Sequence, residues 1–410
     1  MKTPIIHTLA SHRTSQAPNS KELARRAALL ILCVIVILNL CSCWSRRELN
    51  TLAIVLATAL DTGERADTIQ LTAQIVKPGE IKSNSSSSDD QAQKAYANIE
   101  NSGESVISAL NNFSHITNRS MYFSHNRVLI FSSELAKNDV VAGLDAFTRN
   151  FETRMNVYIL ISKGRASEIL NEAVELEKIP ANHLAELLEK QRTNSETVIV
   201  TLRDFSIAML SDSKAPVAAM VEMYLANGRK KARLEGTAVF KQGKMVGELD
   251  VTQTRGLLWA TGDTKKSTIT LDVFGGKVDV LIAHSNGSMK PTKGEDGSIR
   301  MKLKIDADGS VESNETGEDL SSVDSIEMLT VKAQESIRAD IENAIKQARY
   351  LSADVFGFGE AIRGDFPKDW EKIKKNWDKE FSKLEYDIEI DIKIDRTGGL
   401  SKPIVPGGAQ

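Results

Sequence analysis

Two closely spaced cysteines, Cys41 and Cys43, are the residues with the most evident chemistry in this sequence. They lie where an apolar run ends and a charged stretch follows. A cysteine thiolate is a nucleophile and a metal ligand, so its surroundings decide its role. No cysteine follows Cys43, which excludes a disulfide framework or a thiolate metal site in the rest of the chain.

The apolar run before these cysteines has the layout of an export signal. Residues 27–40 read AALLILCVIVILNL and carry no charge, whereas residues 21–26 read KELARR and are net positive. A basic region followed by an apolar region is typical of secretory signals. The stretch from Ala27 to Cys43 is short for a membrane-spanning helix, which needs about 20 residues. It also contains no Ala-x-Ala cleavage site.

The residues around Cys43 resemble a bacterial lipobox. Leu40 stands three residues before Cys43 and the small Ser42 directly before it, whereas Cys41 follows the bulky Leu40 and fits poorly. In such motifs the cysteine thiol takes a diacylglycerol, and cleavage leaves the cysteine as the first residue. We therefore predict a signal peptide over 1–42 and lipidation at Cys43. The alternative is an uncleaved signal anchor.

Three charged residues follow the predicted anchor, and two interpretations of them stay open. Arg46 and Arg47 can rest near lipid phosphates, since basic residues beside a membrane are attracted to anionic lipid. They can equally form salt bridges within the first domain, together with Glu48.

Composition agrees with an exported body. The 410 residues carry a net charge of −3, and the part after Cys43 holds 47 basic and 54 acidic residues. A mildly acidic chain without a basic stripe argues against nucleic-acid binding. A body of roughly 365 residues exceeds what one core usually covers, so two or three domains are expected. No later apolar run is long enough to span a bilayer, so the lipid would be the membrane attachment.

Strands and helices alternate in the first half of the chain, which predicts an α/β domain over 43–195. The predicted strands are apolar or alternate apolar with polar residues, and a hairpin link at Gly63 joins the first two: 51–59, 68–76, 127–131 and 156–161. The predicted helices follow a period near 3.6: 105–117, 139–150, 165–175 and 181–192. Residues 196–232 form a connecting segment or part of a small middle domain, with a helix over 201–210 and a strand over 216–225.

The pattern of residues 233–400 predicts a domain with an antiparallel sheet and a long packing helix. Residues 401–410 are predicted to be a flexible tail. A hairpin spans 234–249, with Lys241-Gln-Gly-Lys244 at its tip. Further strands are predicted at 267–273, 276–285, 299–306, 309–314 and 386–394. A long helix over 320–350 repeats isoleucine every four residues, and another begins near Pro367. The fold class is thus α+β / α/β, with several domains.

The sequence shows no recognisable set of catalytic or metal-binding residues. After Cys43 the histidines are His115, His125, His183 and His284, and none has metal-ligand spacing. The sequence contains no Gly-x-Ser-x-Gly, phosphate-binding loop or dinucleotide-binding fingerprint. His125 is expected to be a hydrogen-bonded residue at a strand entry, with a ligand role as the alternative. We expect no enzyme activity, no cofactor and no metal.

Three further motifs have a structural and a functional interpretation. Gly357-Phe-Gly359 is expected to end a helix, because it follows one and cannot cradle a phosphate. Asp306-Ala-Asp-Gly-Ser310 is expected to be a turn between strands rather than a calcium loop, which would need another acid and a closing Glu. Near the C-terminus a helix combines lysines with tryptophans, which favours either core tryptophans with a solvated face or a contact with anionic head groups: Trp370, Lys374, Lys375, Trp377 and Lys379.

Several stretches together resemble the Ger(x)C spore germination lipoproteins, the C subunits of nutrient germinant receptors. CWSRRELN, from Cys43 onward, is similar to the usual mature start of that family, with Ser45 in place of an acidic residue. The resemblance continues at 122–137, 144–154, 162–170, 235–259 (EGTAVFKQGKMVGELDVTQTRGLLW) and 353–381 (ADVFGFGEAIRGDFPKDWEKIKKNWDKEF). The extension of about 26 residues before the apolar run is longer than the family usually has, which suggests a misplaced start codon or a cytoplasmic tail before cleavage.

The resemblance implies a function. Members of the family sit on the outer face of the spore inner membrane and assemble with a membrane A subunit and a transporter-like B subunit. The complex responds to nutrients, and the chemistry of the C subunit itself is not assigned. The expected function is therefore a lipid-anchored, non-catalytic receptor subunit that binds no nucleic acid. The alternative is an exported solute-binding lipoprotein that binds a nutrient directly, although such proteins usually have two doubly wound lobes.

Overall fold

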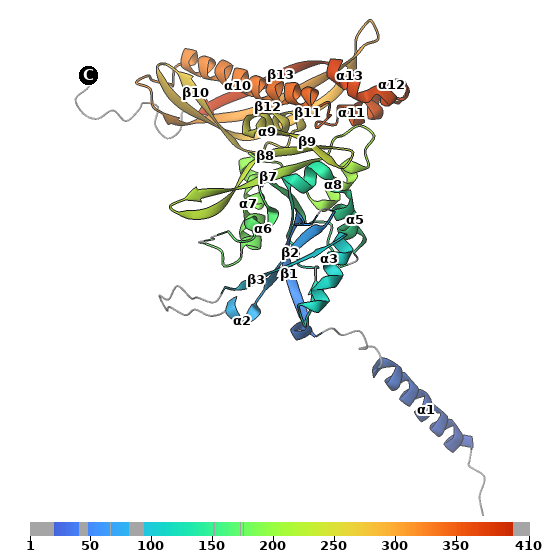
Figure 1. Ribbon diagram of the computed structural model, residues 1–410. Helices are drawn as coiled ribbons and strands as arrows, with labels where there is room; N and C mark the ends of the chain where they lie inside the picture. Colours follow the sequence, from blue (N-terminus) through green and yellow to red (C-terminus); the bar gives the residue numbers. More distant parts are fainter. Residues whose placement is uncertain are drawn as a thin grey trace, which may run out of the picture. The chain divides into compact units, whose positions relative to one another are not determined.

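The computed structural model describes residues 20–40, 48–65, 67–81, 94–150, 152–172, 174 and 176–396 (Figure 1). The chain divides into two compact units, residues 1–52 and 53–410. The first unit contains α1 (Ser20–Leu40) and the 3-10 helix η2 (Leu49–Thr51). Among the described helices, none combines the length and apolarity needed to cross a membrane. The predicted lipidation site Cys43, its neighbours Cys41, Arg46 and Arg47, and the tail 401–410 lie outside the described residues.

The second unit begins with a large mixed sheet of nine described strands, in the order β3-β2-β1-β5-β6-β7-β8-β9, with β4 paired to β1. Strands β1, β5, β6 and β7 are parallel, and the outer pairs on both sides are antiparallel. Their bounds are β1 (Leu52–Thr62), β2 (Ile69–Val76), β3 (Tyr96–Gly103), β4 (Ser120–Tyr122), β5 (Val128–Ser132), β6 (Tyr158–Ser162), β7 (Val217–Ala226), β8 (Arg229–Lys241) and β9 (Lys244–Leu249).

Helices cover both faces of this sheet (Figure 1). Helices α6 and α7 contribute residues to one hydrophobic core, and α3, α5 and α8 contribute to the other. The helices of this part are α2 (Pro78–Ile81), α3 (Val106–Asn112), α4 (Ser133–Asn138), α5 (Val141–Arg149), α6 (Ala166–Ile169), α7 (Pro180–Asn194) and α8 (Leu202–Met209), with the 3-10 helix η3 (Phe113–His115). The predicted α/β arrangement is therefore confirmed. The helix predicted over 165–175 is shorter than expected and ends at Ile169.

Because both faces are covered, several polar side chains of the sheet are buried, and such groups usually need hydrogen-bond partners. Asp61 on β1 accepts hydrogen bonds from the backbone N–H groups of Ala166 and Ser167, at the start of α6. Gln74 on β2, one of the polar residues that alternate with apolar ones in this strand, is fully buried and accepts from Ala181 N at the start of α7. These two side chains tie the helices to the sheet by satisfying N–H groups that a helix leaves free at its first turn.

The hairpins follow the glycine signals in the sequence. The β1–β2 hairpin is confirmed, and Gly63 N donates to Thr68 O at 2.7 Å. The predicted hairpin 234–249 is also confirmed as β8–β9, with Gln242 at φ 50° and Gly243 at φ 81°. Two successive residues with positive φ match the tight turn that suits the twist of antiparallel strands. Because β8 pairs with β7 as well, the first sheet continues to Leu249, and the domain boundaries at 195 and 232 stay predictions.

A second sheet of four described strands has the order β10-β11-β12-β13. The strands are β10 (Ser267–Val273), β11 (Gly276–Lys293), β12 (Ile299–Asn314) and β13 (Glu385–Arg396). The first two pairs are antiparallel as predicted, but β13 runs parallel to β12. A parallel pair needs a long crossover connection, and the helices between β12 and β13 provide it.

The turn predicted at Asp306–Ser310 is wrong, because β12 passes through these residues without interruption. Gly309 lies at a register irregularity of the strand, and a Cβ there would lie 3.2 Å from Ile282 Cδ1 of β11. The glycine therefore marks a close contact between two neighbouring strands. Asp306 pairs with Lys304 at 2.7 Å.

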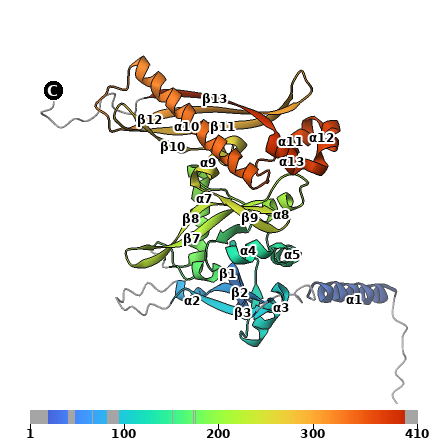
Figure 2. The ribbon, with the colours of Figure 1, turned by 45° about the horizontal axis from the view of Figure 1, so that its top comes forward.

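The helices of this part are α9 (Val251–Thr261), α10 (Val323–Tyr350), α11 (Phe358–Asp365), α12 (Pro367–Ile373) and α13 (Trp377–Lys383), with the 3-10 helix η4 (Lys374–Asn376). Helix α10 lies across the second sheet (Figure 2), and its residues Ile337, Ile341 and Ile345 are buried as predicted. Gln334 Nε2 donates to Ile390 O at 3.0 Å and Arg338 Nη2 to Ile388 O at 2.8 Å. These bonds cover carbonyl groups that the edge strand β13 would otherwise leave exposed.

Candidate functional site

The histidines considered as ligands do not form a metal site. Within the described ranges, no three His, Cys, Asp or Glu side chains are grouped so that they could hold a metal ion. The ring of His125 lies 5.9 Å from that of Tyr122, and no described residue hydrogen-bonds to it, so the predicted hydrogen bond stays a prediction. His183 contacts the buried Glu172 at 3.3 Å. The hydrogen bond that His183 donates to the Glu172 carboxylate is the main cause that raises the pKa of His183 above its usual 6.5.

The Gly357-Phe-Gly359 motif lies at the start of a helix, so its predicted place at a helix end is wrong. Gly357 is the residue before α11 and has φ 84°, which is why a glycine stands there. Asp354 Oδ1 accepts from Gly357 N at 2.9 Å and from Phe358 N at 3.1 Å, and its Oδ2 accepts from Gly359 N at 2.9 Å. Sequence reasoning located the positive φ but missed the carboxylate that caps the helix.

Asp354 is 3% exposed, and this burial has the largest effect on the pKa of its side chain. Burial raises the pKa of Asp354 to about 6, although the three N–H groups favour the charged form. Desolvation disfavours a charge, and hydrogen bonds to the charged form oppose that effect. Asp354 is therefore a buried carboxylic acid whose pKa lies above its usual range.

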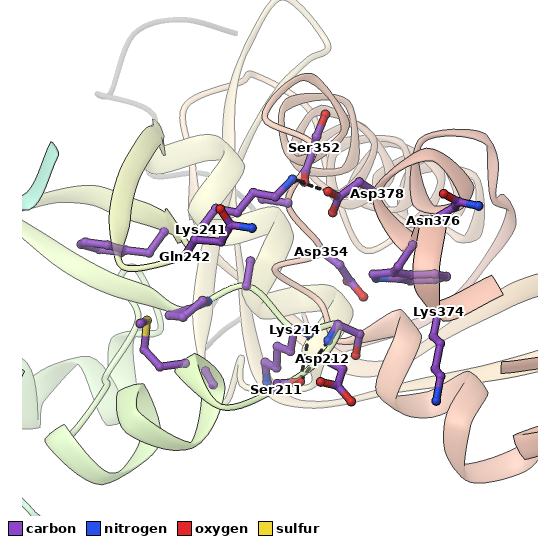
Figure 3. Close-up of a pocket in the computed structure, with 18 of the residues that line it drawn as sticks. Ser211, Asp212, Lys214, Lys241, Gln242, Ser352, Asp354, Lys374, Asn376 and Asp378 are labelled. Carbon is purple, nitrogen blue, oxygen red and sulfur yellow. Dashed lines mark hydrogen bonds and ion pairs between the residues drawn. The ribbon is translucent and has the colours of Figure 1, made fainter. Parts of the chain in front are cut away.

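Asp354 also joins the two sheets. Its carbonyl oxygen accepts a hydrogen bond from Ala215 N at 2.8 Å, in the linker between α8 and β7. In the same linker, Ser211 Oγ donates to Glu360 Oε1 at 2.8 Å. At the end of β8, Lys241 Nζ donates to Ser352 O at 3.0 Å and lies 2.5 Å from Asp378 Oδ2 (Figure 3). These contacts connect the first sheet with the helices that follow α10.

The tryptophans of the basic C-terminal helices belong to the core. Trp370 is 2% and Trp377 4% exposed, and their rings meet edge to face at 5.2 Å. Lys375 and Lys379, in contrast, are exposed. The structure therefore supports the interpretation in which the tryptophans pack inward and the lysines face solvent.

A pocket of about 430 Å³ opens at this junction (Figure 3). Three parts of the chain line it: the α8–β7 linker, the β8–β9 turn, and the C-terminal segments 352–354 and 374–379. The β8–β9 turn lies within 235–259, and the C-terminal segments, apart from Ser352, lie within 353–381; both stretches carry the family resemblance. The sequence does contain a signal for the cap of α11. An aspartate is followed by glycine three and five residues later, in Asp354-Val-Phe-Gly-Phe-Gly359. No local pattern indicated that Lys214 and Lys241 would lie beside it.

Two family matches cover most of the chain. Residues 45–223 match the family described as spore germination protein N-terminal domain. Residues 235–398 match the family described as spore germination B3/GerAC like, C-terminal. Both regions occur in this order along the chain.

Relatives from Bacillus subtilis (strain 168) align over almost their whole length. The chain is 24% identical over 404 residues to spore germination protein KC, and the alignment covers 93% of this chain and 98% of that protein. It is 26% identical over 407 residues to spore germination protein YndF, covering 92% of this chain and 98% of that protein. Spore germination protein B3 is 23% identical over 377 residues, covering 90% and 97%.

A solved structure has the same fold. The crystal structure of the GerBC protein matches with a TM-score of 0.55 and 18% identity, over 83% of this chain and 98% of that chain. At this identity the likeness supports the fold, and the sequence matches carry the family assignment. Together they show that this chain belongs to the Ger(x)C, or GerAC-like, family of spore germination proteins.

Proposed function

We propose that this chain is a lipid-anchored, non-catalytic subunit of a spore nutrient germinant receptor, where it assembles with a membrane A subunit and a transporter-like B subunit. The observation that carries the proposal is the match of both family regions, in order, over residues 45–223 and 235–398. The names of the relatives, spore germination proteins KC, B3 and A3, support a role in germination.

The proposed anchor is a diacylglycerol on the thiol of Cys43. One acyl chain holds a protein only marginally, whereas two hold it stably. An extended chain spans at most about 3.6 Å per residue, so the residues from Cys43 to Leu52 reach roughly 30 Å. The first sheet would therefore stay close to the bilayer, on the outer face of the spore inner membrane.

The proposed work of the subunit is to hold other proteins. A standard stable interface buries about 800 Å² on each partner. The two sheets, joined through Asp354 and Lys241, offer a continuous folded body for such contacts. A substitution at such a contact surface should then change the amount of the A and B subunits that assembles with this chain. It should not change a catalytic rate constant, because the proposed subunit has no turnover of its own.

Deletion of the gene tests this function. Spores that lack the gene should lose the response to one class of nutrient, while other receptors still respond. Expression of the wild-type chain should restore the response. Unchanged germination with every nutrient class would contradict the proposal.

A further inference from the structure

We propose that the pocket between the α8–β7 linker and α13 binds a small soluble organic anion with carboxylate or phosphate groups. The pocket is the one of about 430 Å³ at the junction of the two sheets. This inference goes beyond the receptor function and does not depend on it, because it rests on the charges and shape of the pocket alone.

The charged residues that line the pocket have an excess of positive charge. Five lysines and three aspartates contribute to the lining: Lys214, Lys241, Lys374, Lys375, Lys379, Asp212, Asp354 and Asp378. A cleft with one dominant sign of charge raises the local concentration of ions of the opposite sign. The lining therefore favours an anion over a metal ion or an uncharged sugar.

Contacts within the protein engage two of the three lining aspartates and two of the five lining lysines. Asp378 is paired with Lys241 at 2.5 Å, and the Asp354 carboxylate is enclosed by three backbone N–H groups. Lys374 pairs with Glu371, which lies outside the lining. Asp212 is the remaining exposed acid of the lining.

Three lysines of the lining have no such partner. Among the described residues, no ion pair or side-chain hydrogen bond engages the ammonium groups of Lys214, Lys375 and Lys379. A lysine ammonium is a compact charge with three donors that commonly binds phosphate or carboxylate. These three groups are therefore available to a ligand.

Lys214 is less exposed than Lys375 and Lys379. It is half-buried, and its backbone N–H donates to Ser211 Oγ at 3.0 Å. Its stem passes over Gly357, where a Cβ would lie 3.4 Å from Lys214 Cδ. Figure 3 shows Lys214 and Asp212 on the linker, across from Asp354 and Asn376. Lys214 also lines a neighbouring hollow of about 470 Å³, whose other charged lining residues are Arg192, Lys265, Asp204 and Asp263.

The size and the neutral groups of the pocket agree with a small ligand. A volume of about 430 Å³ falls in the range of roughly 300–1,000 Å³ that is common for small-molecule sites. Ser213, Gln242 and Asn376 line the same space and can donate hydrogen bonds to anionic oxygens. The pocket thus combines charge for attraction with neutral donors for orientation.

Calorimetry on the full chain in detergent tests the proposal, with citrate and inorganic phosphate as probes at constant ionic strength. The wild-type chain should bind at least one probe saturably. Lys214→Gln should weaken that binding on the order of tenfold, as should the double substitution of Lys375→Gln and Lys379→Gln. Lys346→Gln, which changes an exposed lysine of α10 outside the pocket, should leave the binding within about twofold of wild type.

Two results would overturn the proposal. One is the absence of saturable binding of both probes to a wild-type chain that melts normally, and the other is binding that all pocket variants retain. Vesicles that contain phosphatidylglycerol distinguish a lipid head group from a soluble anion. If the chain binds only these vesicles, through the pocket lysines, the soluble ligand is wrong. Since none of these measurements requires A or B subunits, they can fail independently of the receptor function.

Discussion

The backbone of Gly256 in α9 lies directly against the backbone of Asp340 in α10: a Cβ on Gly256 would lie 2.0 Å from the Asp340 carbonyl oxygen. Beside this contact, Arg255 forms a bidentate ion pair with the Asp340 carboxylate: Nε lies 2.6 Å from Oδ2, and Nη2 lies 3.1 Å from Oδ1. Helix α9 directly follows the last strand of the first sheet, and α10 covers the second sheet. The close contact therefore fastens the two sheets together.

Gly256→Ala should destabilise the protein, because the added methyl group meets backbone that cannot rotate away. Overpacking of this kind costs about 1–3 kcal/mol or more. Gly364→Ala is the matched control, since its Cβ would meet no described atom within 4 Å and it lies within α11. Replacing a helical glycine by alanine there should be neutral or stabilising by roughly 0.5–1 kcal/mol. Urea unfolding midpoints measure both, and equal midpoints would show that the helices do not cross so closely.

The free energy of unfolding should depend on pH through the titration of Asp354. Its pKa in the folded protein, about 6, lies above its ordinary 3.8, so the folded state holds the proton more tightly than the unfolded chain. The stability from this group is fully present below the ordinary pKa and is lost as pH rises through the folded pKa. At 1.36 kcal/mol per pKa unit the loss is roughly 3 kcal/mol.

Asp354→Asn removes this titration and serves as the comparison. The free energy of unfolding of the wild type minus that of the variant should fall as pH rises between the two pKa values. Subtracting the variant cancels the other titrating groups, including His183. A difference that stays flat over this window would mean that the folded Asp354 has an ordinary pKa.

A comparison of the β8–β9 turn with the β7–β8 turn separates the cost of a left-handed backbone from the cost of a steric clash. Gly243 has φ 81°, and a Cβ there would lie 2.4 Å from Val141 Cγ2. Gly228, in the turn between β7 and β8, has φ 75° and a Cβ there would meet no described atom within 4 Å. Gly228→Ala should cost about 1 kcal/mol for the left-handed backbone, and Gly243→Ala about 1–3 kcal/mol more for the contact.

Thermal or urea unfolding of the two alanine variants checks this difference. Combining Gly243→Ala with Val141→Ala should recover part of the additional loss, because the second substitution removes the methyl group that clashes. Equal losses at Gly228 and Gly243 would indicate that Val141 does not pack on the turn.

Mass spectrometry of the mature N-terminus tests the anchor. The first residue should be Cys43 carrying a diacylglyceryl group, followed by Trp44, because Leu40 and Ser42 place the cysteine in a lipobox-like context. Cys43→Ala should release the body from membranes, since two acyl chains supply the proposed attachment. A mature chain that still contains residues 1–42 would contradict lipidation and favour the signal anchor.

Local periodicity predicted most of the fold. The isoleucines of α10 and the apolar runs of β5 and β6 define their elements because burial decides them. Strand β3 was missed because YANIENSG has little apolar character and is held by pairing with β2. Gly309 and Gly357 were misinterpreted because glycine marks a turn, a strand irregularity or a helix start equally well.

The candidate site was less accessible to sequence reasoning than the fold. Lys214 and Asp354 lie more than 100 residues apart in the sequence, and Lys241 lies between them. These residues line one pocket because of the way in which the two sheets join. Nothing in the spacing of single residues specifies that junction. The basic and aromatic pattern of α12 and α13 was visible, but only packing shows that Trp370 and Trp377 face inward.

The most direct test of the central claim is affinity purification of this chain from spore inner membranes, with quantitative identification of the proteins that accompany it. The receptor function predicts that one A subunit and one B subunit are enriched together with the wild-type chain, and that both are reduced when Cys43→Ala removes the anchor. Recovery of the chain without either subunit, from membranes that contain both, would contradict it.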